Sequence, residues 1–343
     1  MTSPSAPDPI HICGEALIDF VPVRTARGQN GYVPKPGGSP YNVAVAAARA
    51  GGAPRFVGEI STDFFGEMLH DHLVANRVDC RHVERSDRLS TLAFVDLSSG
   101  CPRYAFHNEG TTNQAMTPRI PHDGQRSILH VGSISLIPEG AGDRILELTR
   151  RHLPHGIVSL DPNVRSSLIG DRRNWLDRIR ALCSHTSILK LSVEDIDYLS
   201  PESDAEAFAA SAIADGIDMV IVTRDSEGAQ AMTAEGAISV NVRPRHIHDT
   251  VGAGDTLTGA VLTWLAGRRI NTRDAVRTLP PQSLETMLRF AVTAAALNCE
   301  AEGCDPPTRS MIEDRLTDVS RVTGTIRGRD ADMHHHILSD SLQ

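Results

Sequence analysis

Short runs of apolar and β-branched residues recur along the chain and alternate with segments that have a helical spacing of apolar positions. Four such runs occupy residues 10–20, 127–135, 156–162 and 219–223. Continuous apolar runs separated by helices are typical of parallel strands that are buried on both faces of a sheet. The pattern therefore predicts a doubly wound α/β core with a mostly parallel sheet flanked by helices.

Two of the predicted helices follow glycine-rich turns. The first covers residues 41–50 and stops at Gly51 and Gly52, and the second covers residues 254–266 and ends at Gly267. Glycine is the residue most often found just after a helix, because it tolerates the left-handed conformation there. Both helices are therefore expected to begin and end close to these glycines.

Two segments interrupt the alternation of strand and helix, at residues 20–36 and 89–108. The second has two alternating runs around Ser98, Ser99 and Gly100, which predicts an antiparallel hairpin with a serine-glycine turn. We expect the two segments to form a small, discontinuous β lid over the core. The tail at residues 323–343 has little apolar periodicity, and we expect it to be mobile.

Composition excludes several classes of protein. The formal net charge of −9 argues against a non-specific nucleic-acid binder. No stretch approaches the roughly 18 apolar residues that a membrane helix needs, so no membrane partner is expected. Residues 1–10 lack the basic and apolar regions of a secretory signal, and we therefore expect a cytoplasmic protein.

The chain contains only two lysines, Lys35 and Lys190. Neither follows the glycine spacing G-x-x-x-x-G-K-[ST], which forms the phosphate loop of P-loop NTPases. No G-x-G-x-x-G follows the first strand with an acidic residue about 20 positions later, as a dinucleotide-binding fold requires. P-loop NTPases and nicotinamide-dependent oxidoreductases are therefore both excluded.

The sharpest chemical feature is HDTVGAGDT at residues 248–256, directly ahead of a predicted helix. The small residues Gly252, Ala253 and Gly254 allow backbone N–H groups to converge at a helix N-terminus, where they can bind phosphate. Asp255 would stay ionised beside this positive end and could accept a hydroxyl proton. The alternative is that Asp255 only caps the helix.

The string DTVGAGDT resembles the second signature of the PfkB (ribokinase-like) family of carbohydrate kinases. The similarity extends from about Cys13 to Thr308. It implies one ribokinase-like kinase domain over residues 8–322, with ATP and Mg²⁺ as cofactors and a K⁺ site as in relatives. It also implies transfer of the ATP γ-phosphate to a sugar hydroxyl, with Asp255 as the base.

Two further motifs resemble the sugar-binding part of this family. GEALID ends in Asp19, and PGGSPYN contains Gly38 and Asn42. The resemblance implies that these three residues line the sugar pocket, although Asn42 could instead be a helix N-cap. The run DPNVR implies that Arg165 lies near the transferring phosphate, with a surface salt bridge as the alternative.

Other runs resemble the nucleotide-binding side of the family. Lys190, Ser192 and Asp195 occupy the positions of a run that helps to place magnesium. Thr223 and Gly228 belong to the nucleotide loop, in which Asp225 replaces a glycine. For the monovalent cation, the resemblance implies a further group of ligands at Asp249, Val251 and Gly303.

The details of the motifs are most similar to bacterial fructokinases, which implies phosphorylation of D-fructose to fructose 6-phosphate. A 2-keto-3-deoxygluconate kinase is the nearest alternative, and Arg103 in the lid is the candidate to bind its carboxylate. Another PfkB sugar or nucleoside kinase, or a non-catalytic sugar or nucleotide sensor, stays open. Relatives also suggest a homodimer formed through the lid.

Overall fold

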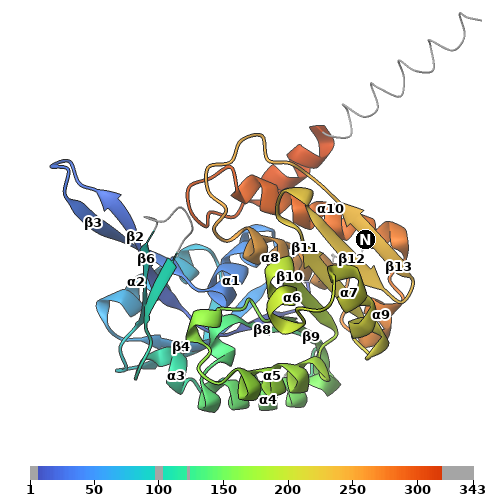
Figure 1. Ribbon diagram of the computed structural model, residues 1–343, viewed down its shortest axis with the longest axis horizontal. Coiled ribbons are helices and arrows are strands. Elements are labelled where there is room, and N and C mark those ends of the chain that lie inside the picture. The colour runs from blue at the N-terminus through green and yellow to red at the C-terminus, as the bar shows by residue number, and fades with distance from the viewer. Residues whose placement is uncertain (1–6, 97–102, 122–123, 319–343) are drawn as a thin grey trace, which may run out of the picture.

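The computed structural model describes residues 7–96, 103–121 and 124–318, and within these ranges nine strands form one large sheet (Figure 1). The order of the strands is β13-β12-β11-β10-β9-β8-β1-β4-β5. Their bounds are β1 (Ile10–Cys13), β4 (Pro54–Ser61), β5 (Asp79–Ser86), β8 (Ser127–Gly132), β9 (Gly156–Asp161), β10 (Ile188–Ser192), β11 (Met219–Thr223), β12 (Ala229–Thr233) and β13 (Gly236–Val240).

Neighbouring strands from β5 to β11 are parallel, and only β12 and β13 pair in the antiparallel sense. The central strands β1, β8 and β9 are buried at every position, as expected for strands covered on both faces. The predicted doubly wound, mostly parallel core is confirmed.

Helices cover both faces of the large sheet (Figure 1). One apolar core involves α1 (Ser39–Arg49), α2 (Phe64–Ala75), α8 (Ala253–Ala266), α9 (Arg273–Arg277) and α10 (Pro281–Asn298). The core on the other face involves α4 (Glu139–His152), α5 (Arg172–Cys183), α6 (Val193–Leu199) and α7 (Ala205–Ala214). Short helical pieces lie at α3 (Thr112–Ala115), η1 (Ser133–Leu136), η2 (Leu153–His155), η3 (Ser166–Leu168) and η4 (Asp225–Glu227). Residues 309–318 are also helical.

The apolar run at residues 10–20 does not form one strand, contrary to the prediction. It divides into β1 in the large sheet and β2 (Leu17–Arg24) in the small one. The break falls at Gly14, where a Cβ atom would lie 2.4 Å from Cγ of Pro40. The chain therefore leaves the large sheet where it passes close to the start of α1.

The small sheet has the order β3-β2-β6-β7, with β3 (Asn30–Gly37), β6 (Thr91–Asp96) and β7 (Arg103–His107). Strands β6 and β7 pair in the antiparallel sense, as the hairpin prediction requires. The predicted turn at Ser98, Ser99 and Gly100 lies outside the described residues, and so does the tail at residues 323–343. Within the described ranges, none of the helices has the length and apolarity to cross a membrane.

Candidate active site

The candidate site lies where the carboxyl ends of the parallel strands meet the N-termini of α1 and α8. Ligands of open α/β sheets bind in this position, beyond the carboxyl ends of the strands. Asp255 lies in the first turn of α8 and is only 8% exposed. The two helices with glycine-rich starts pack against each other, which brings residues near positions 40 and 255 together.

Both oxygens of the Asp255 carboxylate accept hydrogen bonds from α1. Ser39 Oγ donates to Oδ1 at 2.6 Å, and Asn42 Nδ2 donates to Oδ2 at 2.9 Å. Asn42 is not a helix N-cap, since α1 begins at Ser39 and its N-cap is Gly38. The carboxylate of Asp255 is therefore held in one orientation from across the helix interface.

Burial raises the pKa of the Asp255 carboxyl, while hydrogen bonds from Ser39 and Asn42 and the charges of Lys190 and Arg165 oppose that effect. The sequence-based prediction considered only the positive end of the helix, which favours the ionised form. It omitted desolvation, because burial arises from tertiary packing and cannot be deduced from the motif. Asp255 is therefore more basic than its position at a helix N-terminus alone would make it.

The helix N-terminus has the geometry of an anion hole. Gly252 is the N-cap of α8 with a φ of 74°, and a Cβ atom there would lie 2.2 Å from Sγ of Cys304. The N–H of Ala253 donates to Thr250 O, but the next N–H groups of the first turn have no acceptor within a regular helix. These donors fit the oxygens of a phosphate.

Lys190 lies directly beside this helix start. Its Nζ pairs with Oδ2 of Asp161 at 2.9 Å, and both side chains are buried. A Cβ atom on Gly254 would lie 3.0 Å from the same Nζ. The sequence motif placed Lys190 only in a magnesium-positioning run, whereas the structure also places its positive charge at the N-terminal end of α8.

Asp19, Gly38 and Asn42 all belong to the surroundings of Asp255. Asn42 donates to the Asp255 carboxylate, the charge of that carboxylate acts on Asp19, and Gly38 directly precedes Ser39, which is the other donor. Burial raises the pKa of the Asp19 carboxyl to about 7, the charge of Arg165 lowers it, and the charge of Asp255 raises it further. A Cβ atom on Gly37 would lie 2.2 Å from Oδ2 of Asp19, so glycine is required there for Asp19 to occupy this position. The sequence analysis had assigned a role only to the second glycine of the pair.

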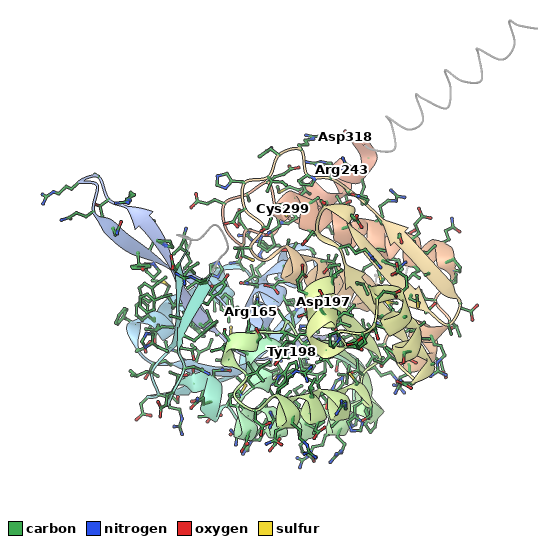
Figure 2. All side chains as sticks on the ribbon, in the orientation of Figure 1. Arg165, Asp197, Tyr198, Arg243, Cys299 and Asp318 are labelled. Atoms are coloured by element: carbon green, nitrogen blue, oxygen red, sulfur yellow. The ribbon has the colours of Figure 1, made fainter. Side chains whose placement is uncertain are left out.

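Arg165 follows β9 and lies between the large and small sheets (Figure 2). Its Nη1 donates to Val164 O at 3.1 Å, and its charge acts on both Asp19 and Asp255. The alternative of a simple surface salt bridge is not what the structure shows, because no ion pair joins Arg165 to another described residue. Its charge therefore faces the site.

Arg103 does not join this site, contrary to the prediction. It pairs across the hairpin with Asp96 and forms a salt bridge with it, and its side chain is 68% exposed. Cross-strand partners place their side chains on the same face of a sheet, and alternate residues face opposite sides. Asp19 pairs with Ala93, which is on the other face from Asp96. The prediction located the strand but not which of its faces points inward.

Tyr104 is the residue of β7 that faces the site instead. It pairs with Val95, on the same face as Ala93. Burial raises the pKa of the Tyr104 hydroxyl, and the charge of Asp19 raises it further. Sequence reasoning missed this residue, although the alternation of the aromatic Tyr104 and Phe106 with other residues along β7 is the signal that could have found it.

The proposed nucleotide side is built from turns that follow β10 and β11. Ser192 caps α6, and its side chain and that of Asp195 form a reciprocal capping box. Thr223 ends β11, and Gly228 has a φ of 87° in the turn before β12. Asp225, which replaces a family glycine, has a φ of 44°. Aspartate tolerates this left-handed region better than most residues, so the loop keeps a glycine-like conformation.

The residues implied for a monovalent cation lie together. The Asp249 carboxylate accepts N–H groups from Val251 at 3.0 Å and from Gly303 at 3.1 Å. Asn298 Nδ2 donates to Val251 O at 2.8 Å, while its buried Oδ1 has no hydrogen-bond partner among the described residues. Carboxylate, carbonyl and amide oxygens are ligands that suit a hard cation.

Magnesium beside Ser192 and Asp195 would be held mainly by phosphate oxygens and water. Within the described ranges, no group of three or more histidine, cysteine, aspartate or glutamate side chains could hold a metal ion. Both oxygens of Asp195 already accept backbone N–H groups, from Val164 at 2.7 Å and from Ser192 at 2.8 Å. A carboxylate oxygen has a second lone pair, which could accept a hydrogen bond from a metal-bound water.

Comparison with known proteins identifies the family. Residues 10–311 match the pfkB family of carbohydrate kinases. A fructokinase from Rhizobium leguminosarum bv. trifolii is 36% identical over 274 residues, which are 79% of this chain and 84% of the relative. The structure of a fructokinase with bound ATP from Xylella fastidiosa is similar with a TM-score of 0.81 and 27% identity, and covers 91% of this chain and 99% of its own.

A second similar structure is a fructokinase from Vibrio cholerae O395 in a form that binds fructose, ADP and calcium. It has a TM-score of 0.77 and 25% identity, and the match covers 90% of this chain and 98% of that one. The family match and the 36% identical relative both extend over most of the chain. The protein therefore belongs to the pfkB family of carbohydrate kinases and is an ATP-dependent sugar kinase.

Proposed function

We propose that the protein transfers the ATP γ-phosphate to the primary hydroxyl of D-fructose, giving fructose 6-phosphate. The observation that carries this proposal is the position of Asp255, whose carboxylate lies in the first turn of α8 beside its unpaired N–H groups. The fructokinase from Rhizobium leguminosarum and the two similar fructokinase structures support the choice of fructose.

Asp255 accepts the proton of the sugar hydroxyl as that oxygen attacks phosphorus. A positioned base of this kind contributes ~10²- to 10⁴-fold in rate. The backbone N–H groups at Gly252 and Gly254, together with Lys190, stabilise the charge on the transferring phosphoryl group, while the Ala253 N–H already donates to Thr250 O within the turn. Arg165, whose charge acts on Asp255, adds a second positive charge to the site.

Asp19 and Asn42 bind the sugar hydroxyls, and Gly38 allows the backbone to approach the ring. When bound, magnesium would neutralise phosphate charge, and Ser192 and Asp195 would hold it through water. Thr223 and Gly228 contact the nucleotide. The oxygens around Asp249, Val251 and Gly303 would hold K⁺, which would add positive charge close to the start of α8.

We further propose that residues 8–322 form the kinase domain and that the small sheet is a lid that closes over the sugar. Closure would exclude water, which otherwise competes as the phosphoryl acceptor. The inward face of this sheet bears Asp19 and Tyr104. Its outer face is aromatic, with Phe20 and Phe94 stacked at 4.6 Å and Tyr32 51% exposed, and we propose that it pairs with a second copy of the chain.

The test is ATP-dependent ADP release with Mg²⁺ and K⁺ against fructose, 2-keto-3-deoxygluconate, ribose, glucose and adenosine. We expect a clear preference for fructose. The outward position of Arg103 removes the group that would have favoured 2-keto-3-deoxygluconate. A preference for another sugar would overturn the choice of fructose, and ATP binding without turnover on any of them would instead indicate a sensor.

A further inference from the structure

Ser39 provides the shorter of the two hydrogen bonds to the Asp255 carboxylate, at 2.6 Å. Asn42 provides the other, but Asn42 already has a proposed role in the sugar pocket, whereas Ser39 has none. We propose that Ser39 is a positioning residue that orients the Asp255 carboxylate toward the sugar hydroxyl, and that buried Glu15 holds Ser39 in place. This inference rests on the proposed role of Asp255 as the base.

The start of α1 explains why Ser39 can do this. Ser39 is the first residue of the helix, so its N–H has no acceptor within the helix. That N–H donates to Oε1 of Glu15 at 3.2 Å, which leaves the hydroxyl free to reach Asp255. Gly38 has a φ of 106°, and a Cβ atom there would lie 2.9 Å from Glu15 O. The turn therefore packs closely on Glu15.

Glu15 links three segments that surround the site. It is 1% exposed, and its Oε2 accepts the N–H of Ser135 at 3.2 Å, in the turn that follows β8. No ion pair joins it to another described residue. Burial raises the pKa of the Glu15 carboxyl to about 7, and hydrogen bonds from Ser133, Ser135 and Ser39 oppose that effect. A buried carboxyl group bound in this way fixes the start of α1 relative to the sheet.

The electrostatic surroundings of Asp255 show what the Ser39 hydroxyl adds. Asp19 from β2 and Asp161 from β9 are acidic neighbours, while Lys190 from β10 and Arg165 after β9 are basic ones. A hydrogen bond to a carboxylate favours its charged form, and burial disfavours it. Loss of the Ser39 hydroxyl should therefore raise the pKa of Asp255 and leave its carboxylate free to rotate.

The test is the pH profile of kcat/KM for the sugar in Ser39→Ala. We expect the acid limb to move up by about one pH unit, as the loss of one hydrogen bond to a charged group implies. Below the limb, kcat/KM should then be roughly tenfold lower than in the wild type, with KM for the sugar unchanged. Ser39→Thr keeps the hydroxyl, so its acid limb should lie at the wild-type pH. Glu15→Gln should shift the acid limb in the same direction as Ser39→Ala.

Thr263→Val is the matched control. The Thr263 hydroxyl joins the same two helices by donating to Ala47 O at 3.1 Å, but it does not touch Asp255. This variant should lower Tm without moving the acid limb. An equal shift in Thr263→Val and Ser39→Ala would mean that helix packing alone is responsible and would overturn the inference.

Asp255→Asn separates this inference from the proposed function. If Asp255→Asn stays active, the proposed base is wrong. If it is inactive while Ser39→Ala keeps the wild-type profile, or changes only KM, the positioning role of Ser39 is wrong and the proposed function stands. Tm and ADP binding are measured on every variant, and Ser39→Gly repeats the test should Ser39→Ala not fold.

Discussion

At the scale of single residues, the acid–base chemistry depends on Asp255. Asp255→Asn keeps the volume of the side chain but cannot accept the hydroxyl proton, so we expect kcat to fall ~10²- to 10⁴-fold. Binding of ADP, measured by calorimetry, should stay within about twofold, because the proposed nucleotide contacts lie in the turns that follow β10 and β11 and do not include the Asp255 carboxylate. Asp274→Asn, at a side chain that is 92% exposed, is the control. Unchanged kcat in Asp255→Asn would remove this residue from the mechanism.

Asp19 gives a second prediction at this scale, which concerns how the free energy of unfolding depends on pH. Burial raises the pKa of its carboxyl to about 7 from 3.8. The folded state therefore binds this proton more tightly than the unfolded state. The resulting stabilisation is fully present below about pH 4 and is lost as the pH rises through 7.

Asp19→Asn removes this titration. Its free energy of unfolding, relative to the wild type, should rise between pH 4 and pH 8 by at most about 4 kcal/mol. Comparison with the wild type is needed because burial lowers the pKa of His130 to about 3, which gives a slope of opposite sign. Urea denaturation at several pH values measures the difference, with the exposed Asp177→Asn as a control. A difference that does not vary with pH would contradict the raised pKa.

At the scale of elements, the start of α8 depends on Gly252. Gly252→Ala would place a methyl group against Cys304 and force alanine into a left-handed conformation. The strain alone costs on the order of 1–3 kcal/mol, and any shift of the helix start moves the anion hole. We expect a lower Tm and a loss of kcat of at least about tenfold.

Gly28→Ala is the matched control for Gly252→Ala. Gly28 has a similar φ of 73°, but a Cβ atom there would have no neighbour within 4 Å. It should therefore lose on the order of 1–3 kcal/mol of stability, which is what backbone strain alone costs, and keep full activity, as judged by Tm and steady-state rates. An equal loss of activity in both variants would mean that backbone strain, and not the position of the helix start, is responsible.

The difference between local and tertiary information explains what the sequence could predict. The two helices, their glycine-rich starts and the proposed role of Asp255 follow from contiguous motifs, and the structure has both helices close to where they were expected. The inward face of β7 depends on the register of β6 and β7, which the sequence leaves open, so Arg103 was chosen and Tyr104 missed. Ser39 contacts Asp255, which is 216 positions away in the chain, and Glu15, which is 24 positions away. Contacts between residues so far apart have no signal in a local motif.

At the scale of the whole molecule, the small sheet projects from the body of the protein, with β2 and β3 reaching furthest (Figure 1). Its outer face exposes Tyr32, and Phe64 of the adjoining α2 is 73% exposed. Adjacent exposed aromatic side chains favour a protein interface, since burying them removes apolar surface from water. We therefore predict a solution mass of twice 37.1 kDa by light scattering.

Tyr32→Arg should convert this dimer to a monomer, because a charged side chain in the centre of an apolar interface loses its hydration without gaining a partner. The small sheet carries Asp19 on its inner face. If pairing with a second copy holds this sheet in place, Tyr32→Arg should raise KM for the sugar more than it lowers kcat. Met311→Arg, at a side chain that is 50% exposed in the helix at residues 309–318, is the control and should keep both mass and kinetics. A wild-type chain that stays monomeric at working concentration would show that the aromatic face does not pair with a second copy. A Tyr32→Arg variant that is monomeric but keeps the wild-type KM would show that pairing does not support the sugar pocket.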